Sequence, residues 1–203
     1  MSSLTEFISV VAQSPWAFVL LAALLVVDGF FPFVPGETVV VALATLGAAG
    51  HGPSPVAVFL VATAATMVGD GIAFAIGRTV GIDRWAWMRH PRSVRALAWT
   101  AGSIERRPML ILVVAKYLPY ARVAVTMTAG ASDLRVRRYL TISLVASALY
   151  TGYHVIVAVT AGTLLARYPL LALAASIGFG LVTGLVTAGV RALRTRFARR
   201  SGE

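Results

Sequence analysis

The sequence predicts an all-α integral membrane protein with two opposed re-entrant helical hairpins and about three full transmembrane spans, arranged as an inverted repeat. Composition is the first reason: 58% of the 203 residues are hydrophobic and 13% are charged, against about 45–50% and about 25% in a soluble domain. The second reason is that polar, charged breaks interrupt the shorter apolar stretches. The third is that basic residues gather in short segments between apolar stretches, which is typical of cytoplasmic loops in membrane proteins.

Six apolar stretches follow one another along the chain. Crossing a bilayer takes about 20 residues at a rise of about 1.5 Å each. Three stretches are long enough to cross: 56–77, 139–162 and 170–190. The other three are shorter or interrupted: 16–27, 38–50 and 109–132.

Arginine and lysine set the predicted orientation. Fourteen of the 18 basic residues lie in three segments: 84–107, 135–138 and 191–200. The positive-inside rule places these segments in the cytoplasm, so the C-terminus is expected to be cytoplasmic. A net charge of +10 is also compatible with nucleic-acid binding. Its placement between apolar spans favours membrane topology, and we expect no nucleic-acid partner.

Residues 109–132 lie between two basic segments that should both be cytoplasmic. A single crossing would leave one of these segments outside, and Lys116, Pro119 and Arg122 interrupt the middle of the stretch. We therefore predict a hairpin that enters from the cytoplasm and returns, with arms of roughly 10 residues, or about 15 Å each. Pro119 is placed at its tip, because proline lacks an N–H and disfavours helix in the residue before it.

A second interruption, Asp-Gly-Phe-Phe-Pro-Phe-Val-Pro-Gly-Glu over residues 28–37, separates the first two apolar stretches. Its prolines, glycines and carboxylates do not continue a helix. We predict a hairpin that enters from outside; the alternative is a first arm that crosses fully, lengthened by residues 4–14. The residues assigned a structural role in the two hairpin tips are Pro32, Pro35, Gly36, Pro119 and Gly130.

A hairpin followed by a span thus occurs twice, in opposite orientations. Pro35 and Asp70 are 35 residues apart, and so are Pro119 and His154. This overlay makes Asp70 and His154 equivalent positions. Inverted repeats with broken helices near the midplane are typical of secondary transporters. Residue identity between the halves is low, so a coincidence of spacing is the alternative.

The predicted organisation is one membrane domain over residues 16–165, preceded by an N-terminal segment, 1–15. Within it, residues 83–107 form a cytoplasmic linker whose apolar face favours a helix lying in the membrane interface, with a solvated loop as the alternative. A final transmembrane span, 166–190, and a basic cytoplasmic tail, 191–203, complete the chain.

Several chemical classes are disfavoured by the residue types present. The chain has no cysteine, which excludes disulfides and cysteine metal sites. Its three histidines, at 51, 90 and 154, are too scattered to suggest zinc. It contains no His-Glu-x-x-His, Gly-x-Ser-x-Gly or P-loop motif. We expect no enzyme activity, no metal and no cofactor.

Non-helical backbone at membrane depth must face protein or water, so two hairpin tips that meet would form a polar site near the midplane. The first hairpin would contribute Asp28 and Glu37, and the second Lys116 and Arg122. A charge at the bilayer centre costs about 2.5–3.5 kcal/mol on insertion scales. Pairing across the site would offset much of this, and function is the usual reason to retain such groups.

Glu37 is the leading candidate for a carboxylate that couples to protons or ions, with a helix-starting cap as the alternative. Arg122 is the best anion ligand, because its planar fork can hold a phosphate in two bonds, and Lys116 would add a point charge. The alternative for both cations is that they only neutralise Asp28 and Glu37.

Three further residues have weaker assignments. Asp28 and Asp70 are candidates for ion coupling; the alternatives are solvation for Asp28, and pairing with Arg78 or snorkelling for Asp70. His154 is a possible proton relay, although a hydrogen-bonded packing histidine is the favoured interpretation.

The motifs together resemble the DedA family, also called the VTT or SNARE-associated superfamily. The resemblance is carried by Asp28-Gly-Phe-Phe-Pro-Phe-Val-Pro-Gly-Glu37, by Gly69-Asp70 with Gly77-Arg78, and by Lys116-Tyr-Leu-Pro-Tyr-Ala-Arg122 followed by Ala129-Gly130. It covers roughly residues 16–165. The resemblance implies facing re-entrant hairpins, with essential acids at Glu37 and Asp28 and essential cations at Arg122 and the position of Lys116. The family usually has arginine at this last position, so Lys116 departs from the pattern.

The resemblance also implies a protein of the bacterial inner membrane that moves lipids. The expected substrate is a phosphate-bearing lipid, either undecaprenyl phosphate or a phospholipid, with coupling to protons or sodium. The alternatives are a small-ion or drug–proton antiporter and a non-transporting scaffold or chaperone. The sequence leaves open whether the chain acts alone or as a homo-oligomer.

Overall fold

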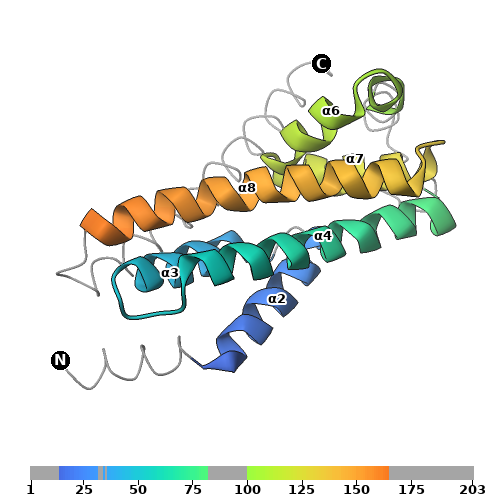
Figure 1. The fold of residues 1–203 in the computed structure, drawn as a ribbon. Coiled ribbons are helices and arrows are strands. Elements are labelled where there is room, and N and C mark those ends of the chain that lie inside the picture. The colour runs from blue at the N-terminus through green and yellow to red at the C-terminus, as the bar shows by residue number, and fades with distance from the viewer. Residues whose placement is uncertain (1–13, 32–33, 35, 82–99, 165–203) are drawn as a thin grey trace, which may run out of the picture.

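The computed structural model describes residues 14–31, 34, 36–81 and 100–164, which are helical apart from short connections (Figure 1). No strand occurs in these ranges, which confirms the predicted all-α class. Residues 100–106 are helical. The other helices, in chain order, are α2 (Pro15–Phe30), α3 (Gly36–Ala48), α4 (Pro55–Val80), α6 (Pro108–Lys116), α7 (Pro119–Ala131) and α8 (Val136–Leu164).

Proline and glycine mark the ends of several helices. Proline is the first residue of α2, α4, α6 and α7, where its missing N–H has no intrahelical partner to lose and its fixed φ suits a helix. Ser14 adds a cap to α2, because its Oγ accepts a hydrogen bond of 3.3 Å from the Trp16 N–H. Helix α4 stops at Gly81, whose φ of +76° is accessible to glycine.

Two of the three predicted spans are described by the structure. Pro55–Val80 and Val136–Thr160 are long and apolar enough to cross a membrane, and the two helices run side by side through the molecule (Figure 1). The third predicted span, 170–190, lies outside the described residues. So do the tail 191–203 and most of the linker 83–107.

The short helices pack on these two long helices in a reciprocal pattern. In the first hairpin, α2 packs on α4 and α3 packs on α8. In the second hairpin, α6 packs on α8 and α7 packs on α4. Each hairpin therefore contacts the long helix that follows it through its first arm, and the other long helix through its second arm.

Glycine lets the helices approach closely at their crossings. A Cβ atom on Gly29 of α2 would lie 2.4 Å from the carbonyl carbon of Gly69 in α4. A Cβ atom on Gly77 of α4 would lie 2.0 Å from the Met127 oxygen in α7, and one on Gly130 would lie 2.0 Å from the Phe74 oxygen. These distances leave no room for any larger residue, so the glycines fix the depth of each crossing.

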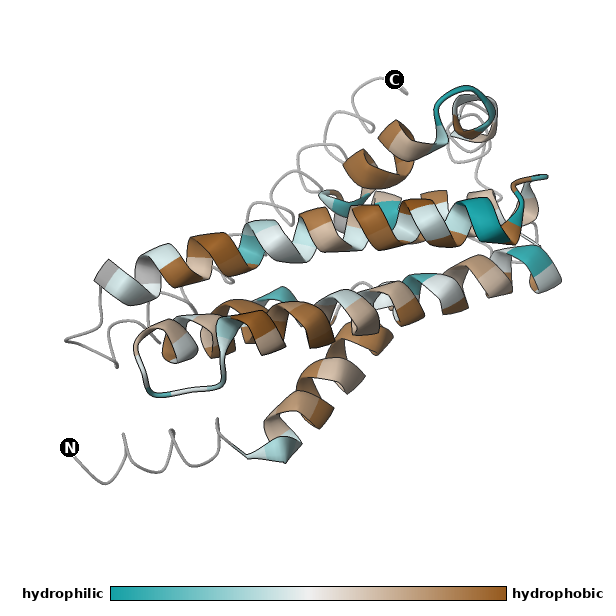
Figure 2. Ribbon diagram, in the orientation of Figure 1, coloured by the Kyte–Doolittle hydropathy of each residue, from teal (hydrophilic) through white to brown (hydrophobic). Residues whose placement is uncertain are grey.

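The basic segments that flank the second hairpin meet at one end of the bundle. Arg78 of α4 donates a hydrogen bond of 3.1 Å from Nη1 to the Leu134 carbonyl, in the connection between α7 and α8. Ile104 packs with Leu134 in one buried cluster. Both outer ends of the α6–α7 pair therefore lie together, as a hairpin requires. Figure 2 shows hydrophilic residues concentrated where α8 begins.

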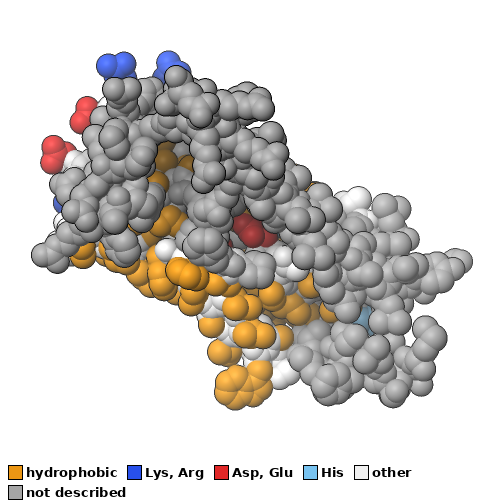
Figure 3. All heavy atoms as spheres, turned by 180° about the vertical axis from the view of Figure 1, so that it is seen from behind, with side chains coloured by type: hydrophobic (Ala, Val, Ile, Leu, Met, Phe, Trp, Pro, Cys, Tyr) orange, Lys and Arg blue, Asp and Glu red, His pale blue; other side chains and the backbone are white. Residues whose placement is uncertain are grey.

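Apolar side chains cover much of the outer surface of the described helices. Trp16 is 76% exposed and Ile156 is 69% exposed, and Figure 3 shows hydrophobic side chains gathered along one flank. Large exposed apolar faces are uncommon on soluble monomers. Lipid is the solvent that suits this surface.

The first break is shorter than the sequence predicts. We expected residues 28–37 to leave the helix, whereas α2 continues through Asp28 and Gly29 to Phe30 and α3 begins at Gly36. The reason is tertiary packing, because Gly29 lies against Gly69 of α4 and a helix satisfies the backbone there. Pro32 and Pro35 lie outside the described residues.

Candidate functional site

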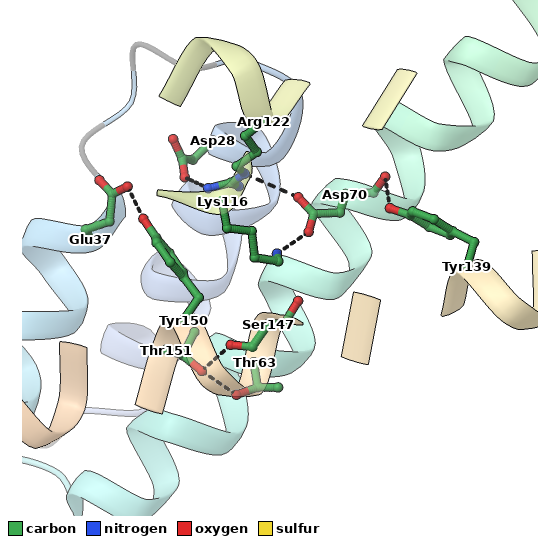
Figure 4. A network of polar contacts seen from close by, with 10 residues as sticks. All are labelled: Asp28, Glu37, Thr63, Asp70, Lys116, Arg122, Tyr139, Ser147, Tyr150 and Thr151. Carbon is green, nitrogen blue, oxygen red and sulfur yellow. Dashed lines mark hydrogen bonds and ion pairs between the residues drawn. The ribbon is translucent and has the colours of Figure 1, made fainter. Parts of the chain in front are cut away.

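A cluster of four buried charged side chains lies where the two hairpins meet α4 (Figure 4). Its members are Asp28 of α2, Asp70 of α4, Lys116 at the end of α6 and Arg122 in α7. Their exposed fractions are 6%, 3%, 5% and 4% in that order. Two carboxylates and two cations make the cluster neutral, which is the arrangement that keeps buried charges tolerable.

Arg122 bridges the two carboxylates. Its Nη1 donates to Oδ2 of Asp28 at 3.1 Å, and its Nε donates to Oδ1 of Asp70 at 3.3 Å. Its remaining Nη2 is buried and has no hydrogen-bond partner in the described part of the chain. The guanidinium carbon also lies 6.0 Å from the centre of the Tyr150 ring, within cation–π range. Arg122 thus keeps an unused donor inside an otherwise paired cluster.

Lys116 completes the pairing through Asp70. Its Nζ donates to Oδ2 of Asp70, the oxygen that Arg122 does not use. Lys116 is the last residue of α6, where the negative end of the helix dipole favours a cation. Its Nζ lies 5.9 Å from the centre of the Tyr150 ring. Asp70 therefore holds both cations of the second hairpin.

Adjacent acid and glycine residues bring the two carboxylates together. Asp28 precedes Gly29 in α2, and Gly69 precedes Asp70 in α4. Because the two glycines are in contact, the helices cross at closest approach beside both aspartates. A wider crossing would move the carboxylates apart and deprive Arg122 of one partner.

Tyr139 supports the cluster from α8. Its hydroxyl donates a hydrogen bond of 2.9 Å to the backbone oxygen of Asp70, and its ring stacks on Phe74 at a centroid distance of 3.9 Å. The side chain is 1% exposed. Tyr139 therefore fixes α4 against α8 at the level of the charges.

Glu37 forms a second branch of the polar network. It lies in the first turn of α3 and accepts a hydrogen bond from the Tyr150 hydroxyl. It makes no ion pair with a described residue. From the sequence we expected Glu37 to pair directly with the cations of the second hairpin. In the structure, Glu37 is instead connected to Lys116 and Arg122 through the Tyr150 ring (Figure 4).

His154 lies one turn beyond Tyr150 on the same helix. Its Nδ1 is 2.8 Å from the Tyr150 carbonyl oxygen, and its ring packs edge-on against Tyr150 and Tyr153. These contacts are those of a hydrogen-bonded packing histidine. A relay role for His154 remains a prediction.

Two expected placements are wrong. Asp70 was given Arg78 as its alternative partner, whereas it pairs with Lys116 and Arg122, and Arg78 bonds the Leu134 carbonyl. Gly130 was assigned to a hairpin tip, whereas it lies in the last turn of α7, far along the second arm. Its role is the close contact with α4, which only glycine permits.

Two residues separate α6 from α7. Helix α6 ends at Lys116, residues 117 and 118 make the turn, and α7 begins at Pro119. In the first hairpin, Gly36 begins α3 and is buried against Leu25 and Asp28 of α2. Gly36 thus supports the packing next to Asp28.

The sequence missed the tyrosines of α8, although a signal for them exists. Polar residues recur every three or four positions along this apolar helix, so they share one face. All are buried: Tyr139, Ser143, Ser147, Tyr150, Thr151 and His154. A polar stripe within a transmembrane span predicts a face turned toward the protein interior.

The described residues offer little space or coordination for a bound ion. The void beside Asp70, Lys116 and Arg122 has a volume of about 10 Å³, close to the minimum for one water molecule. No group of three His, Cys, Asp or Glu residues in the described ranges is arranged to hold a metal. In this arrangement the two carboxylates are the hydrogen-bond partners of the two cations.

A family model for the VTT domain matches residues 34–162, which is more than half of the chain. The chain belongs to the VTT-domain family. Glu37, Asp70, Lys116 and Arg122 fall within the matched residues, and Asp28 lies just before them. With its two apolar helices of spanning length, this VTT-domain chain is a membrane protein of the DedA type. No curated protein and no solved structure matches it.

Proposed function

We propose that this VTT-domain protein transports a phosphate-bearing lipid, either undecaprenyl phosphate or a phospholipid, with coupling to protons or sodium. The observation that carries the proposal is the buried cluster in which Arg122 and Lys116 are held by carboxylates while Nη2 of Arg122 has no partner in the described part of the chain. Intramembrane charges of this kind mark ion and substrate pathways in membrane proteins.

The cations suit a phosphate headgroup. A phosphate oxygen is an acceptor for guanidinium and ammonium N–H groups, as a carboxylate oxygen is. A phosphate that reached the cluster would find the free Nη2 donor first and would then compete with Asp28 for Nη1. Asp28 is the easier partner to displace, because it shares one bond with the cluster and Asp70 shares two.

The same competition supplies coupling. A phosphate that takes Arg122 from Asp28 leaves a buried carboxylate without a cation, and such a group is unstable at this depth. A proton or a sodium ion on Asp28 would restore neutrality. Glu37, one hydrogen bond from Tyr150, is the second acidic group that could exchange a proton as the site changes access.

The packing pattern supports a two-fold repeat. Helix α3 crosses α8 where Gly162 lies against Thr45, and α7 crosses α4 near Gly130 and Gly77. Thr45 and Gly130 are 85 residues apart, and so are Gly77 and Gly162. The two crossings therefore correspond under one offset, close to the spacing that the prolines predict. Opposed re-entrant hairpins in an inverted repeat follow from this correspondence as part of the proposal.

The membrane placement belongs to the proposal too. A bacterial inner membrane with the C-terminus in the cytoplasm follows from the family and from the basic segments at one end of the bundle. In this orientation the α6–α7 hairpin opens to the cytoplasm and the α2–α3 hairpin opens outward.

Lipid translocation in proteoliposomes tests the proposal. One set of vesicles carries phosphatidylglycerol with a fluorescent acyl chain, bleached from outside by dithionite. A second carries undecaprenyl phosphate, whose outward phosphates are released by an added phosphatase. The unmodified protein should accelerate the loss of fluorescence or the release of phosphate in at least one set of vesicles. Glu37→Gln and Arg122→Ala should reduce that rate at least about ten-fold, the scale of losing one charge-assisted hydrogen bond.

Matched variants separate transport from folding. Arg137→Ala removes an exposed arginine and should leave the rate unchanged. Arg122→Lys keeps the charge and loses the two-pronged geometry, so a slow but folded variant points to phosphate recognition. Normal translocation by both Glu37→Gln and Arg122→Ala would refute the lipid-transport proposal. Proton flux in vesicles that lack phosphate lipids would favour the antiporter.

A further inference from the structure

A groove lies between α6 and α8, lined by residues other than those of the charge cluster. Its volume is about 760 Å³. Arg107 and Arg138 line one end, and the lining continues along apolar residues: Met109, Leu110, Val113 and Leu149. The groove is thus basic at one end and apolar along its length.

The positive charge of the groove is not balanced by acidic residues in its described lining. Arg107 and Arg138 are both exposed, neither makes an ion pair with a described residue, and the described lining of the groove contains no acidic residue. A neighbouring cavity of about 620 Å³ shares Arg138 with the groove and has Glu105 and Asp133 in its lining. The groove thus presents two arginines to a ligand, and no ion pair joins either of them to these two acidic residues.

A helix start adds to the attraction for anions. Helix α6 begins at Pro108, directly after Arg107, so the unpaired N–H groups of its first turn point toward the basic end. The backbone and both arginines therefore favour a negative group at the same place.

The length of the groove matches the hydrocarbon thickness of one bilayer leaflet. Arg138 and Leu149 lie eleven positions apart on α8, which is about 16 Å along the helix. Half of a hydrocarbon core is about 15 Å. An acyl chain that starts beside Arg138 would end near Leu149.

We propose that this groove binds an anionic phospholipid, with the phosphate between Arg107 and Arg138 and one acyl chain along α6 and α8. The site is separate from the buried cluster, because the groove and the void beside Asp70 share no lining residue. It goes beyond the transport proposal and holds whether or not the cluster moves lipid.

Site-specific quenching tests the groove without any transport measurement. The chain has no cysteine, so Leu110→Cys can carry a single bimane fluorophore in the groove. The protein is placed in vesicles of phosphatidylcholine with increasing brominated-chain phosphatidylglycerol, or with brominated phosphatidylcholine. Quenching at Leu110→Cys should show a preference of about ten-fold for the anionic lipid, and this preference should fall as salt is raised.

Two controls isolate the arginines and the position. Leu60→Cys, on an exposed apolar site of α4, should report equal quenching by the two lipids. Arg107→Ala with Arg138→Ala should abolish the preference at Leu110→Cys. Arg106→Ala with Arg137→Ala removes the same charge from exposed residues that do not line the groove, and should retain the preference.

Three results would overturn the proposal. The first is equal quenching by both lipids at Leu110→Cys. The second is a preference that survives Arg107→Ala with Arg138→Ala. The third is weak quenching by both lipids at Leu110→Cys with strong quenching at Leu60→Cys, which would mean that another protein segment covers the groove.

Discussion

The Nε atom of Arg122 lies 3.3 Å from Oδ1 of Asp70, and each side chain is 4% exposed. Lys116 occupies the other oxygen of the same carboxylate. One residue of α4 therefore joins both arms of the second hairpin, while Asp28 joins only one of them to the first hairpin. The stability of the cluster and its proposed exchange with phosphate both depend on this inequality.

Asp70→Asn should destabilise the protein more than Asp28→Asn. Removing one partner of a buried ion pair costs about 3–5 kcal/mol. The substitution of Asp70 removes an acceptor from two cations, whereas the substitution of Asp28 removes an acceptor from one. Unfolding in mixed micelles, followed by circular dichroism, gives the two free energies. The double variant Asp70→Asn with Lys116→Met should recover part of the loss, because it removes the stranded ammonium. Equal losses for the two aspartates would show that Asp70 is not the central acceptor.

Gly69→Ala should destabilise the crossing of α2 and α4. Its Cβ would lie 2.6 Å from the Val26 oxygen, and forced overpacking costs about 1–3 kcal/mol. Gly71→Ala is the matched control two residues away, because nothing lies within 4 Å of its Cβ. That control should be neutral, or more stable by about 0.5–1 kcal/mol through helix propensity. Thermal unfolding in detergent should rank the two variants, and the reverse order would contradict the crossing.

Tyr150→Phe should destabilise the protein, because it removes the hydrogen bond to Glu37. The lost hydroxyl donates to a carboxylate, and hydrogen bonds to charged groups contribute about 1.5–3 kcal/mol. Tyr153→Phe alters a half-exposed residue of the same helix and should change stability by less than about 0.5 kcal/mol. The measurement is again the unfolding free energy in mixed micelles. Indistinguishable variants would mean that the Tyr150–Glu37 bond contributes nothing.

Thiol labelling should place both ends of the second hairpin on one side of the membrane. Since the chain has no cysteine, Arg106→Cys and Asp133→Cys can each be probed in intact cells with an impermeant maleimide. Both should be protected until the cells are opened, whereas Ser54→Cys at the other end of α4 should react at once. Opposite behaviour of positions 106 and 133 would turn the hairpin into a single crossing.

The sequence by itself determined the membrane class, the helical class and the break between Lys116 and Pro119. The residue composition indicates that lipid surrounds much of the protein, because a chain with only 13% charged residues cannot cover a water-exposed surface. Proline decides where α4, α6 and α7 begin, since its effect on the backbone is local. Three charges of the buried cluster, Asp28, Lys116 and Arg122, were placed in one polar site from the sequence, but the fourth predicted member was Glu37, where the structure has Asp70.

Only the tertiary structure decided which charges pair and how deep each one lies. Asp28 and Arg122 are 94 positions apart, and Asp70 and Lys116 are 46 apart. Their meeting depends on helix rotation and on crossings that Gly29 and Gly69 make close. For the same reason, the helix continued through Asp28 against its local composition. Local preferences of the backbone amount to less than about 1 kcal/mol per residue, so packing between distant helices overrides them.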